Sequence, residues 1–372
     1  MRVLVTTFPG YGHFHPVAPL ALACKRAGHD VRVATDAGFG RWVQSCGLTV
    51  MPAGLSQDDA VSRVAHLSPS ERPVSLFTTI AVSPFARDVL SASERWQPDL
   101  VVSEEGEHAG PLIASVLGVP SVTHSWPAPA RPVEERTARL AALDAVWRAF
   151  GQRGRPRLYG DVYLDCCPAP LQTVAIDGVD GVLTVRPTMF DGPPSAAPPF
   201  VLERLEAPVA FVTLGTVAMF SPPDTLRLLV DAVARDFATV IAATGPHPAS
   251  VIPARANVRS ARYVPLSAVL PVTDLVVSQG GASTTVACVL AGVPHLIVPQ
   301  GAPSQQRAAA SVVSLGIGGA VHGDRLDAPT VASAARALLG DREIHDRIDA
   351  VRAPLDALPG PDRIARELVG SC

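Results

Sequence analysis

Two stretches of the chain follow nearly the same pattern, separated by close to half of its length. Residues 99–126 read DLVVSEEGEHAGPLIASVLGVPSVTHSW, and residues 274–303 read DLVVSQGGASTTVACVLAGVPHLIVPQGAP. Each begins with an apolar run typical of a strand buried on both faces, continues through a helix of small residues and ends in Gly-Val-Pro before a second strand. This internal repeat predicts two similar α/β domains, and a cleft between two such domains is a natural site for a two-part ligand.

The second copy of the repeat has a glycine-rich turn between its strand and its helix. Gly280 and Gly281 follow the apolar run directly, and Ser283 and Thr284 place hydroxyl groups on the first turn of the helix. Free backbone N–H groups and the positive end of the helix dipole gather at such a junction, which therefore predicts an anion site. The alternative is a turn that needs glycine only for its geometry.

Composition limits the classes of function. The chain has 372 residues, enough for about two domains, is 48% hydrophobic and carries a net charge of −3, so it has no basic field for nucleic acid. Six cysteines show no CxxC pair and no metal-ligand spacing, which is typical of thiols in a reducing compartment. With no signal peptide and no apolar run of the roughly 20 residues that span a bilayer, we expect a cytoplasmic protein without a membrane span.

The order of the expected elements is that of a doubly wound α/β fold. In the first half we expect strands at residues 2–6, 31–34 and 48–51, a Gly/His/Pro loop at 8–15, and helices at 16–27, 39–46, 77–90 and 134–151. In the second half we expect strands at 209–214, 239–243 and near Val258, and helices at 224–237, 328–339, 342–358 and 361–370. The sequence DGPPSAAPP at residues 191–199 predicts a stiff linker.

A histidine-containing loop follows the first expected strand, where ligands bind in open α/β sheets. One interpretation is a dinucleotide loop, because Gly10 and Gly12 form GxG and Asp36 follows the second strand, although His15 stands in place of the third glycine. Another interpretation takes His13 as a general base, since histidine titrates near neutrality. The alternative for His13 is a hydrogen-bonding role within a turn, and we expect His15 to be structural.

Several short motifs match one family in order along essentially the whole chain. They are GxGHxxP at residues 10–16, Gly215-Thr216 after the first strand of the second half, YVPL at 263–266, the GG…GVP stretch and PQGA at 299–302. The chain resembles the GT-B nucleotide-sugar glycosyltransferases, in the bacterial branch that decorates macrolide, enediyne and aromatic polyketide natural products. The resemblance implies two Rossmann-like doubly wound α/β domains facing across a cleft: an acceptor domain at 1–192, a linker at 193–200, a donor domain at 201–355 and a C-terminal helix at 356–372 that crosses back.

The resemblance also implies a reaction. A sugar would pass from a dTDP- or UDP-sugar to a hydrophobic aglycone with inversion at the anomeric carbon, without a metal ion or other cofactor. His13 would take the proton of the acceptor hydroxyl, and an acidic side chain would orient it. We assign Glu104 as this acidic partner. Plant relatives place an Asp further along, near Ala109, so Glu105 and Glu107 are alternative partners. A further alternative is that these acids form only a solvated loop.

Binding residues follow from the same likeness. The expected donor-binding residues are Gly215, Thr216, Tyr263, Val264, Gln279, Gly280, Gly281, Ser283, Thr284, Pro303 and Ser304. The expected acceptor-binding residues are Tyr11, Phe14, Phe77 and Trp126. Tyr263 stands where the family often has Trp. Its side chain could pack near the base of the nucleotide or in the core of the domain.

Two departures from the family pattern concern the donor. Gln279 stands where a His usually precedes GG, and Pro303-Ser304 stand where Asp-Gln usually contacts sugar hydroxyls. Fewer polar groups favour a deoxygenated sugar, with Arg307 able to compensate for the missing His. The same departures motivate a catalytically weak or inactive auxiliary protein as an alternative, and an NAD(P)-binding enzyme is a further one. The sugar, the aglycone, the bond type and the choice between monomer and homodimer stay open.

Overall fold

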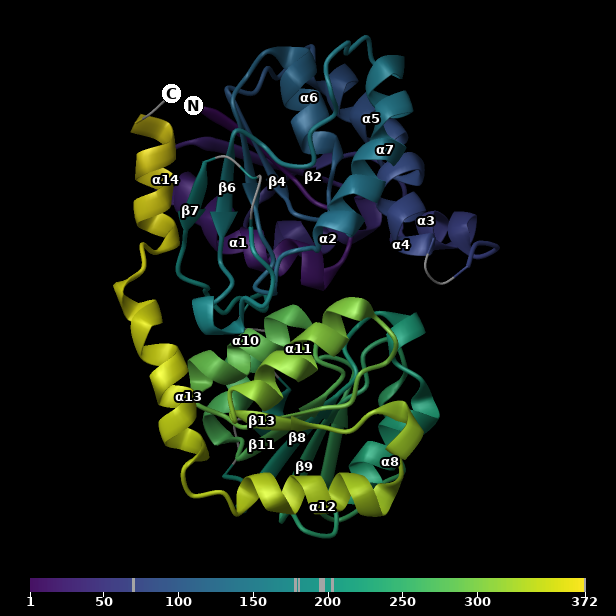
Figure 1. Cartoon of the computed structure of the whole chain (residues 1–372), viewed down its shortest axis with the longest axis vertical. Coiled ribbons are helices and arrows are strands. Elements are labelled where there is room, and N and C mark those ends of the chain that lie inside the picture. The colour runs from purple at the N-terminus through teal and green to yellow at the C-terminus, as the bar shows by residue number, and fades with distance from the viewer. Residues whose placement is uncertain (69–70, 177–178, 180, 194–197, 202–203, 371–372) are drawn as a thin grey trace.

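The computed structural model describes residues 1–372 except 69–70, 177–178, 180, 194–197, 202–203 and 371–372. The described chain forms two α/β domains, one above the other in Figure 1, each built on a parallel sheet covered by helices. Residues 194–197 of the expected linker lie outside the described part. None of the helices within the described ranges is long and apolar enough to cross a membrane.

The first domain has a 7-stranded sheet in the order β3-β2-β1-β4-β5-β6-β7, with every neighbouring pair parallel. Its strands are β1 (Arg2–Thr6), β2 (Asp30–Thr35), β3 (Thr49–Pro52), β4 (Leu100–Glu104), β5 (Ser121–His124), β6 (Val162–Asp165) and β7 (Val182–Thr184). Its helices are α1 (Tyr11–Arg26), α2 (Ala37–Ser45), α3 (Gln57–Val64), α4 (Arg72–Ser75), α5 (Val82–Ser93), α6 (Ala109–Leu117) and α7 (Val133–Ala149), with a π-helical turn at Leu76–Ile80. The strand order reverses at the β1–β4 pair, which is where ligands bind in open α/β sheets.

The second domain has a 6-stranded parallel sheet in the order β10-β9-β8-β11-β12-β13. Its strands are β8 (Val209–Thr213), β9 (Thr239–Ala243), β10 (Val258–Ala261), β11 (Leu275–Ser278), β12 (His295–Ile297) and β13 (Gly318–Ala320). Its helices are α8 (Pro223–Val233), α9 (Leu266–Val269), α10 (Ala282–Ala291), α11 (Pro303–Ser314), α12 (Ala328–Leu339) and α13 (Ile344–Arg352). Here the order reverses at the β8–β11 pair, and α10 and α11 form the side that faces the first domain (Figure 1).

The repeated sequence builds the same β-α-β unit in both domains. β4, α6 and β5 correspond to β11, α10 and β12, and both helices end at a left-handed glycine, Gly118 with φ 69° and Gly292 with φ 75°. Asp99 and Asp274, which open the two copies, each accept a 2.7 Å hydrogen bond from the first backbone N–H of the neighbouring strand, β1 or β8. The repeat therefore specifies the two units that line the reversal points of the sheets.

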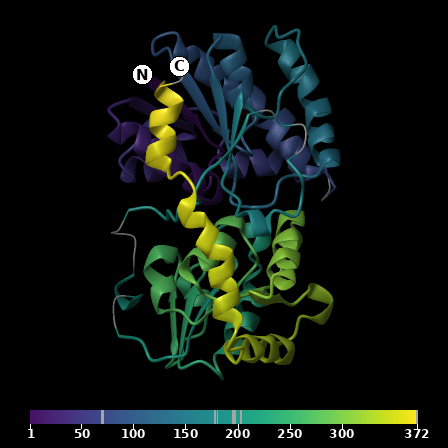
Figure 2. The same ribbon diagram turned by 60° about the vertical axis from the view of Figure 1, so that its left-hand side comes forward.

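The last helix, α14 (Pro361–Gly370), returns to the first domain. Figure 2 shows the chain running from the second domain along one side of the molecule to this helix, which packs against α1. Ile364 and Ala365 are buried in the core of the first domain, and Asp362 pairs with Arg26 of α1 at 2.6 Å. The C-terminus thus ties the two domains together a second time, beside the linker.

Most expected elements are confirmed to within a few residues, but the loop expected at residues 8–15 is wrong in a way that matters. Helix α1 begins at Tyr11, so His13 and His15 lie in its first turns. Pro16 and Pro19 both lie inside this helix. Each proline removes one ladder hydrogen bond, and the burial of the apolar face of α1 compensates for this cost.

Candidate active site

His13 and Glu104 meet at the β1–β4 reversal point of the first sheet. His13 lies in the first turn of α1, directly after β1, and Glu104 is the last residue of β4. The His13 Nδ1 atom lies 2.8 Å from Glu104 Oε1. Because an ionised carboxylate only accepts hydrogen bonds, Nδ1 carries the proton in this pair, and the lone pair of Nε2 is left for a substrate.

The Glu104 carboxylate is held by further donors. Its Oε1 atom also accepts from the Phe8 N–H at 3.3 Å, and its Oε2 atom accepts from the Gly106 N–H and the Trp126 Nε1–H, both at 2.7 Å. The Glu104 side chain is fully buried, so these hydrogen bonds replace the water that it has lost. They fix the carboxylate and, through it, the orientation of the His13 ring.

Aromatic rings enclose the His13 imidazole. Its ring centroid lies 5.1 Å from that of Phe8, 5.4 Å from that of Phe77 and 5.0 Å from that of Trp126. The His13 side chain is 15% exposed, so a narrow part of it is accessible. A Cβ atom on Gly106 would lie 2.5 Å from Trp126 Cζ2 and 3.1 Å from His13 Cε1; glycine is therefore required here for the close approach of the two rings.

The two other acidic candidates have different partners. Glu107 accepts hydrogen bonds from the Ala109 and Gly110 N–H groups at 2.6 and 2.9 Å, at the start of α6, and burial raises its pKa to about 7. Glu105 lies 3.4 Å from Nε of Arg131, and burial raises the pKa of its carboxyl group. Of the three acids, Glu104 is the one in contact with His13.

At the corresponding reversal point of the second sheet lie Gly215 and Gln279. Gly215 follows β8 in the left-handed conformation, with φ 76°, and Gln279 directly follows β11. The two residues pack tightly, because a Cβ atom on Gly215 would lie 2.3 Å from Gln279 Nε2. The Gln279 Oε1 atom is buried without a hydrogen-bond partner among the described residues. An unsatisfied amide oxygen at a reversal point is free to accept a hydrogen bond from a donor group of a ligand.

The first turn of α10 faces the other domain beside this amide. Gly281 precedes the helix without a side-chain cap, so the first N–H groups of α10 are open to a ligand. Ser283 and Thr284 are half-buried on this turn, and Thr216 is half-buried after β8. The structure therefore brings these predicted donor residues together around a helix N-terminus, which suits an anion.

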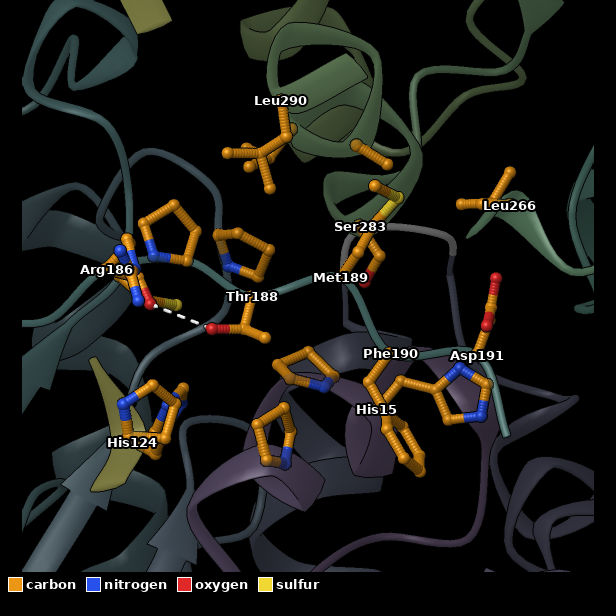
Figure 3. Close-up of a pocket in the computed structure, with 18 residues that line it drawn as sticks. His15, His124, Arg186, Thr188, Met189, Phe190, Asp191, Leu266, Ser283 and Leu290 are labelled. Atoms are coloured by element: carbon orange, nitrogen blue, oxygen red, sulfur yellow. Dashed lines mark hydrogen bonds between the residues drawn. The ribbon is translucent and has the colours of Figure 1, made fainter. Parts of the chain in front are cut away.

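Two cavities lined by both domains meet this turn. The larger is drawn in Figure 3: Ser283 and Leu290 of α10 approach it from one domain, His15 and His124 from the other, and the connecting segment from Arg186 to Asp191 crosses between them. The smaller is lined by Gly280, Ala282 and Ser304 and by residues 127–129, which follow Trp126. The smaller cavity therefore lies between the first turn of α10 and the segment that follows Trp126.

Two of the predicted binding residues have side chains in the cores. Phe14 is fully buried and packs against Phe39 and Phe190. It does not line an acceptor pocket, because the earlier start of α1 turns this position toward the core. Val264 is buried in the core of the second domain, which leaves its backbone, and not its side chain, available to a ligand.

Tyr11 and Tyr263 meet at the junction of the domains. Their rings stack at 5.5 Å with an interplanar angle of 25°, and Tyr11 also packs edge-on against Trp42. The Tyr263 hydroxyl donates a 2.6 Å hydrogen bond to the Asp191 carbonyl of the connecting segment. These contacts hold α1, the connecting segment and the second domain together. Tyr11 therefore packs at the domain junction, and the aromatic rings around His13 are those of Phe8, Phe77 and Trp126.

The dinucleotide interpretation finds no support in the surroundings of Asp36. Its carboxylate caps α2 by accepting hydrogen bonds from the Gly38 and Phe39 N–H groups at 2.6 and 3.1 Å. Both carboxylate oxygens are therefore engaged by the backbone. Within the described residues, no three His, Cys, Asp or Glu side chains gather as metal ligands.

Sequence reasoning missed several residues around the His13–Glu104 pair. Gly106 occupies the place in the first repeat that Gly281 has in the second, so the repeat itself contains the signal for it. Phe8 contributes a backbone donor and a ring, and only its position next to the GxGH motif could have indicated this. Arg131 and Arg139 flank Glu135 at intervals of four residues, a spacing typical of helical ion pairs.

The family of the chain is shown by comparison with known proteins. Residues 22–215 and 227–370 match the models of the N-terminal and C-terminal domains of erythromycin biosynthesis protein CIII-like proteins. The L-demethylnoviosyl transferase of Streptomyces niveus is 34% identical over 371 residues, covering 92% of this chain and 90% of the relative. The glycosyltransferase SsfS6 of Streptomyces sp. SF2575, solved with thymidine diphosphate, and the glycosyltransferase SnogD of Streptomyces nogalater each superimpose with a TM-score of 0.83 at 26% identity, covering 100% of both chains. The chain belongs to the erythromycin biosynthesis protein CIII-like family and is a glycosyltransferase with the GT-B fold.

Proposed function

We propose that the protein transfers a sugar from a dTDP- or UDP-sugar to a hydroxyl group of an apolar natural-product aglycone, with inversion and without a metal ion or other cofactor. The observation that carries this proposal is the 2.8 Å contact between His13 Nδ1 and the buried Glu104 carboxylate. The likeness to SsfS6, which was solved with thymidine diphosphate, supports a dTDP-linked donor.

In the proposed reaction, His13 Nε2 accepts the proton of the acceptor hydroxyl while that oxygen bonds to the anomeric carbon. The bond between this carbon and the diphosphate oxygen breaks, and its electron pair leaves with the nucleoside diphosphate. Attack from the face opposite the leaving group inverts the anomeric centre. Glu104 keeps the proton on Nδ1 and supplies the negative charge that stabilises the imidazolium as it forms, as the acid does in a Ser-His-Asp triad.

The leaving diphosphate would lie at the first turn of α10. Its negative charge increases as the glycosidic bond breaks, and the open N–H groups after Gly281, together with the Ser283 and Thr284 hydroxyls, are donors oriented before the reaction begins. Gly215 and Thr216 border the same place from β8. These groups offer the stabilisation that a metal ion supplies to diphosphates elsewhere.

The rings of Phe8, Phe77 and Trp126 suit an apolar acceptor. They pack against the His13 ring, provide apolar contact area and exclude water, which strengthens the electrostatic interactions of the catalytic pair. An aromatic or polyketide aglycone would bind against these rings, with the reacting hydroxyl next to Nε2.

The direct test is a transfer assay with dTDP- and UDP-sugars against a panel of macrolide and aromatic polyketide aglycones, with and without EDTA. Mass spectrometry should find glycosylated product, NMR should find the inverted anomeric configuration, and EDTA should leave the rate unchanged. Retention of configuration, or loss of turnover with EDTA that Mg²⁺ restores, would contradict the mechanism. Failure of every donor while the protein still binds dTDP would favour an auxiliary role.

A further inference from the structure

Buried guanidinium groups lie directly behind the aromatic rings that surround His13. The Arg131 Cζ atom lies 4.8 Å from the centroid of the Trp126 ring, and the Arg139 Cζ atom lies 5.7 Å from that of Phe77. The side chains of Arg131 and Arg139 are only 9% and 1% exposed. Arginine is rarely buried to this extent unless its charge and its N–H groups are matched.

The partners of these two arginines are incomplete. Glu105 and Glu135 lie 3.4 and 3.3 Å from Arg131, and Glu135 lies 3.2 Å from Arg139. Nevertheless, the Nε and Nη2 atoms of Arg131 and the Nε atom of Arg139 have no hydrogen-bond partner among the described residues. A buried N–H group without an acceptor is costly. The Arg131 Nε atom has only the Glu105 carboxylate at 3.4 Å, outside hydrogen-bond geometry, and the Arg131 Nη2 and Arg139 Nε atoms have no acceptor among the described residues, so an oxygen atom of a ligand would stabilise them.

A third arginine approaches from the other domain. Arg307 is half-buried on α11 and lies within electrostatic reach of Glu135, Arg131 and Glu105. Its Nε atom is also buried without a hydrogen-bond partner in the described part of the chain. Arg131, Arg139 and Arg307 therefore gather around Glu105 and Glu135 at the junction of the two domains, and Glu104 and Asp165 lie within electrostatic reach of Glu105. Ser304 and Ala308, which flank Arg307 on α11, line the cavity that also contacts residues 127–129.

We propose that Arg307 and Arg131 form a subsite for an acidic group of the acceptor, a carboxylate or an ionised enol or phenol, at the end of the aglycone away from the reacting hydroxyl. The subsite rests on the proposed sugar transfer and specifies its acceptor. A planar carboxylate offers two oxygens to the forked N–H groups of arginine, which gives both charge and geometry.

The position of the subsite relative to His13 favours the acceptor over the donor diphosphate. The Trp126 ring contacts both groups, at 5.0 Å from the His13 ring and 4.8 Å from Arg131 Cζ, so His13 and Arg131 are no more than about 10 Å apart. A bicyclic aromatic compound with a hydroxyl at one end and a carboxylate at the other is long enough to span a separation within this limit. The diphosphate has its own donors at the first turn of α10, and Arg131 and Arg139 belong to the acceptor domain.

The test uses 6-hydroxy-2-naphthoate and its methyl ester, which share a scaffold and a hydroxyl and differ in charge. Their equilibrium binding to the full-length protein with dTDP present is followed by fluorescence. We expect the wild type to bind the acid about tenfold or more tightly than the ester, as a charge-assisted contact would give. The Arg307→Gln variant should bring this ratio below about threefold through weaker binding of the acid alone. Arg342→Gln, which removes an equally charged but exposed arginine, should keep the wild-type ratio.

A second, more conservative variant controls for misfolding of Arg307→Gln. Arg131→Lys keeps the charge opposite Glu105 and loses the fork, so we expect a ratio between those of the wild type and Arg307→Gln. Equal binding of acid and ester by the wild type, no measurable binding of either, or a ratio that survives Arg307→Gln would overturn the subsite. So would weaker binding of dTDP by Arg307→Gln at an unchanged ratio, which would assign Arg307 to the diphosphate. Because the readout is binding, the subsite can stand if the transfer assay fails, and transfer to neutral aglycones can stand if the subsite fails.

Discussion

The Nδ1 atom of His13 lies 2.8 Å from a Glu104 carboxylate that is fully buried and that receives three further hydrogen bonds, from Phe8, Gly106 and Trp126. The carboxylate cannot rotate away without losing these donors. It therefore determines which nitrogen of His13 presents its lone pair to a substrate, and it places a counter-charge where the imidazolium would form.

Glu104→Gln should reduce kcat by about 10²–10⁴. The new amide N–H₂ group either opposes the donors of Gly106 and Trp126 or donates to His13 Nδ1, which moves the ring proton to Nε2 and removes the base. Turnover measured against pH should also show a displaced acidic limb. Glu105→Gln leaves the His13 contact intact and should keep the wild-type pH profile. If only Glu105→Gln changes the pH profile, the partner of His13 has been misassigned.

Gly106→Ala tests the close packing of the catalytic pair. The added methyl group would lie 2.5 Å from Trp126 and 3.1 Å from His13, so both rings must move. A displacement of about 1 Å at a reacting group can cost about 10²-fold in rate, and we expect a loss of this size with unchanged dTDP binding. Gly12→Ala is the matched control, because a Cβ atom there has no neighbour within 4 Å. Equal kcat values for the two variants would contradict the packing described for Gly106.

The donor side predicts a preference for deoxygenated sugars. Ser304 lines the cavity beside α10, and Pro303, exposed at the start of α11, has no side-chain donor. A site with few polar groups leaves few of them unpaired when the sugar lacks hydroxyls. The kcat/KM for a dTDP-2,6-dideoxysugar should exceed that for dTDP-glucose, and the double variant Pro303→Asp/Ser304→Gln should narrow the gap. Equal or better use of dTDP-glucose by the wild type would refute this prediction.

Glu107 should make stability fall as the pH rises. Burial raises its pKa to about 7 in the folded protein, above the ordinary value of about 4.3 in the unfolded chain. The stability linked to its proton is fully present below about pH 4 and is lost as the pH rises through 7, a loss of about 3–4 kcal/mol. Urea unfolding at several pH values should show this slope in the wild type and a flatter one in Glu107→Gln. If the free energy of unfolding depends on pH in the same way in the wild type and in Glu107→Gln, ionisation of Glu107 does not destabilise the folded protein.

The fold was predictable because its signals are local. The apolar runs after Asp99 and Asp274 form strands that are buried throughout, and Gly118 and Gly292 end the following helices in the left-handed conformation that favours glycine. The start of α1 was not predictable in this way. Proline at position 16 normally marks a first turn, and it is the packing of the whole helix in the core that allows it inside.

The site was predictable only in part. Sequence motifs identify candidate residues, but the tertiary structure determines how their side chains are oriented. The GxGH motif indicates His13, but it is the earlier start of the helix that turns Phe14 into the core. The acidic loop contains three candidates, and Glu104 is the one at the end of β4, directly after the Thr6–Ser103 pair of β1 and β4. Contacts between distant segments, such as Trp126 on Glu104 or Tyr11 on Tyr263, have no signal in the local sequence.

The role of His13 as the base of a sugar transfer is tested by the turnover number of His13→Ala with a donor and acceptor that the wild type uses. We expect kcat to fall by about 10²–10⁴ while dTDP binding stays within about twofold of the wild type. The matched control, His66→Ala, removes an exposed histidine of the same domain and should keep the wild-type rate. A His13→Ala variant that turns over at a rate near that of the wild type would contradict the account.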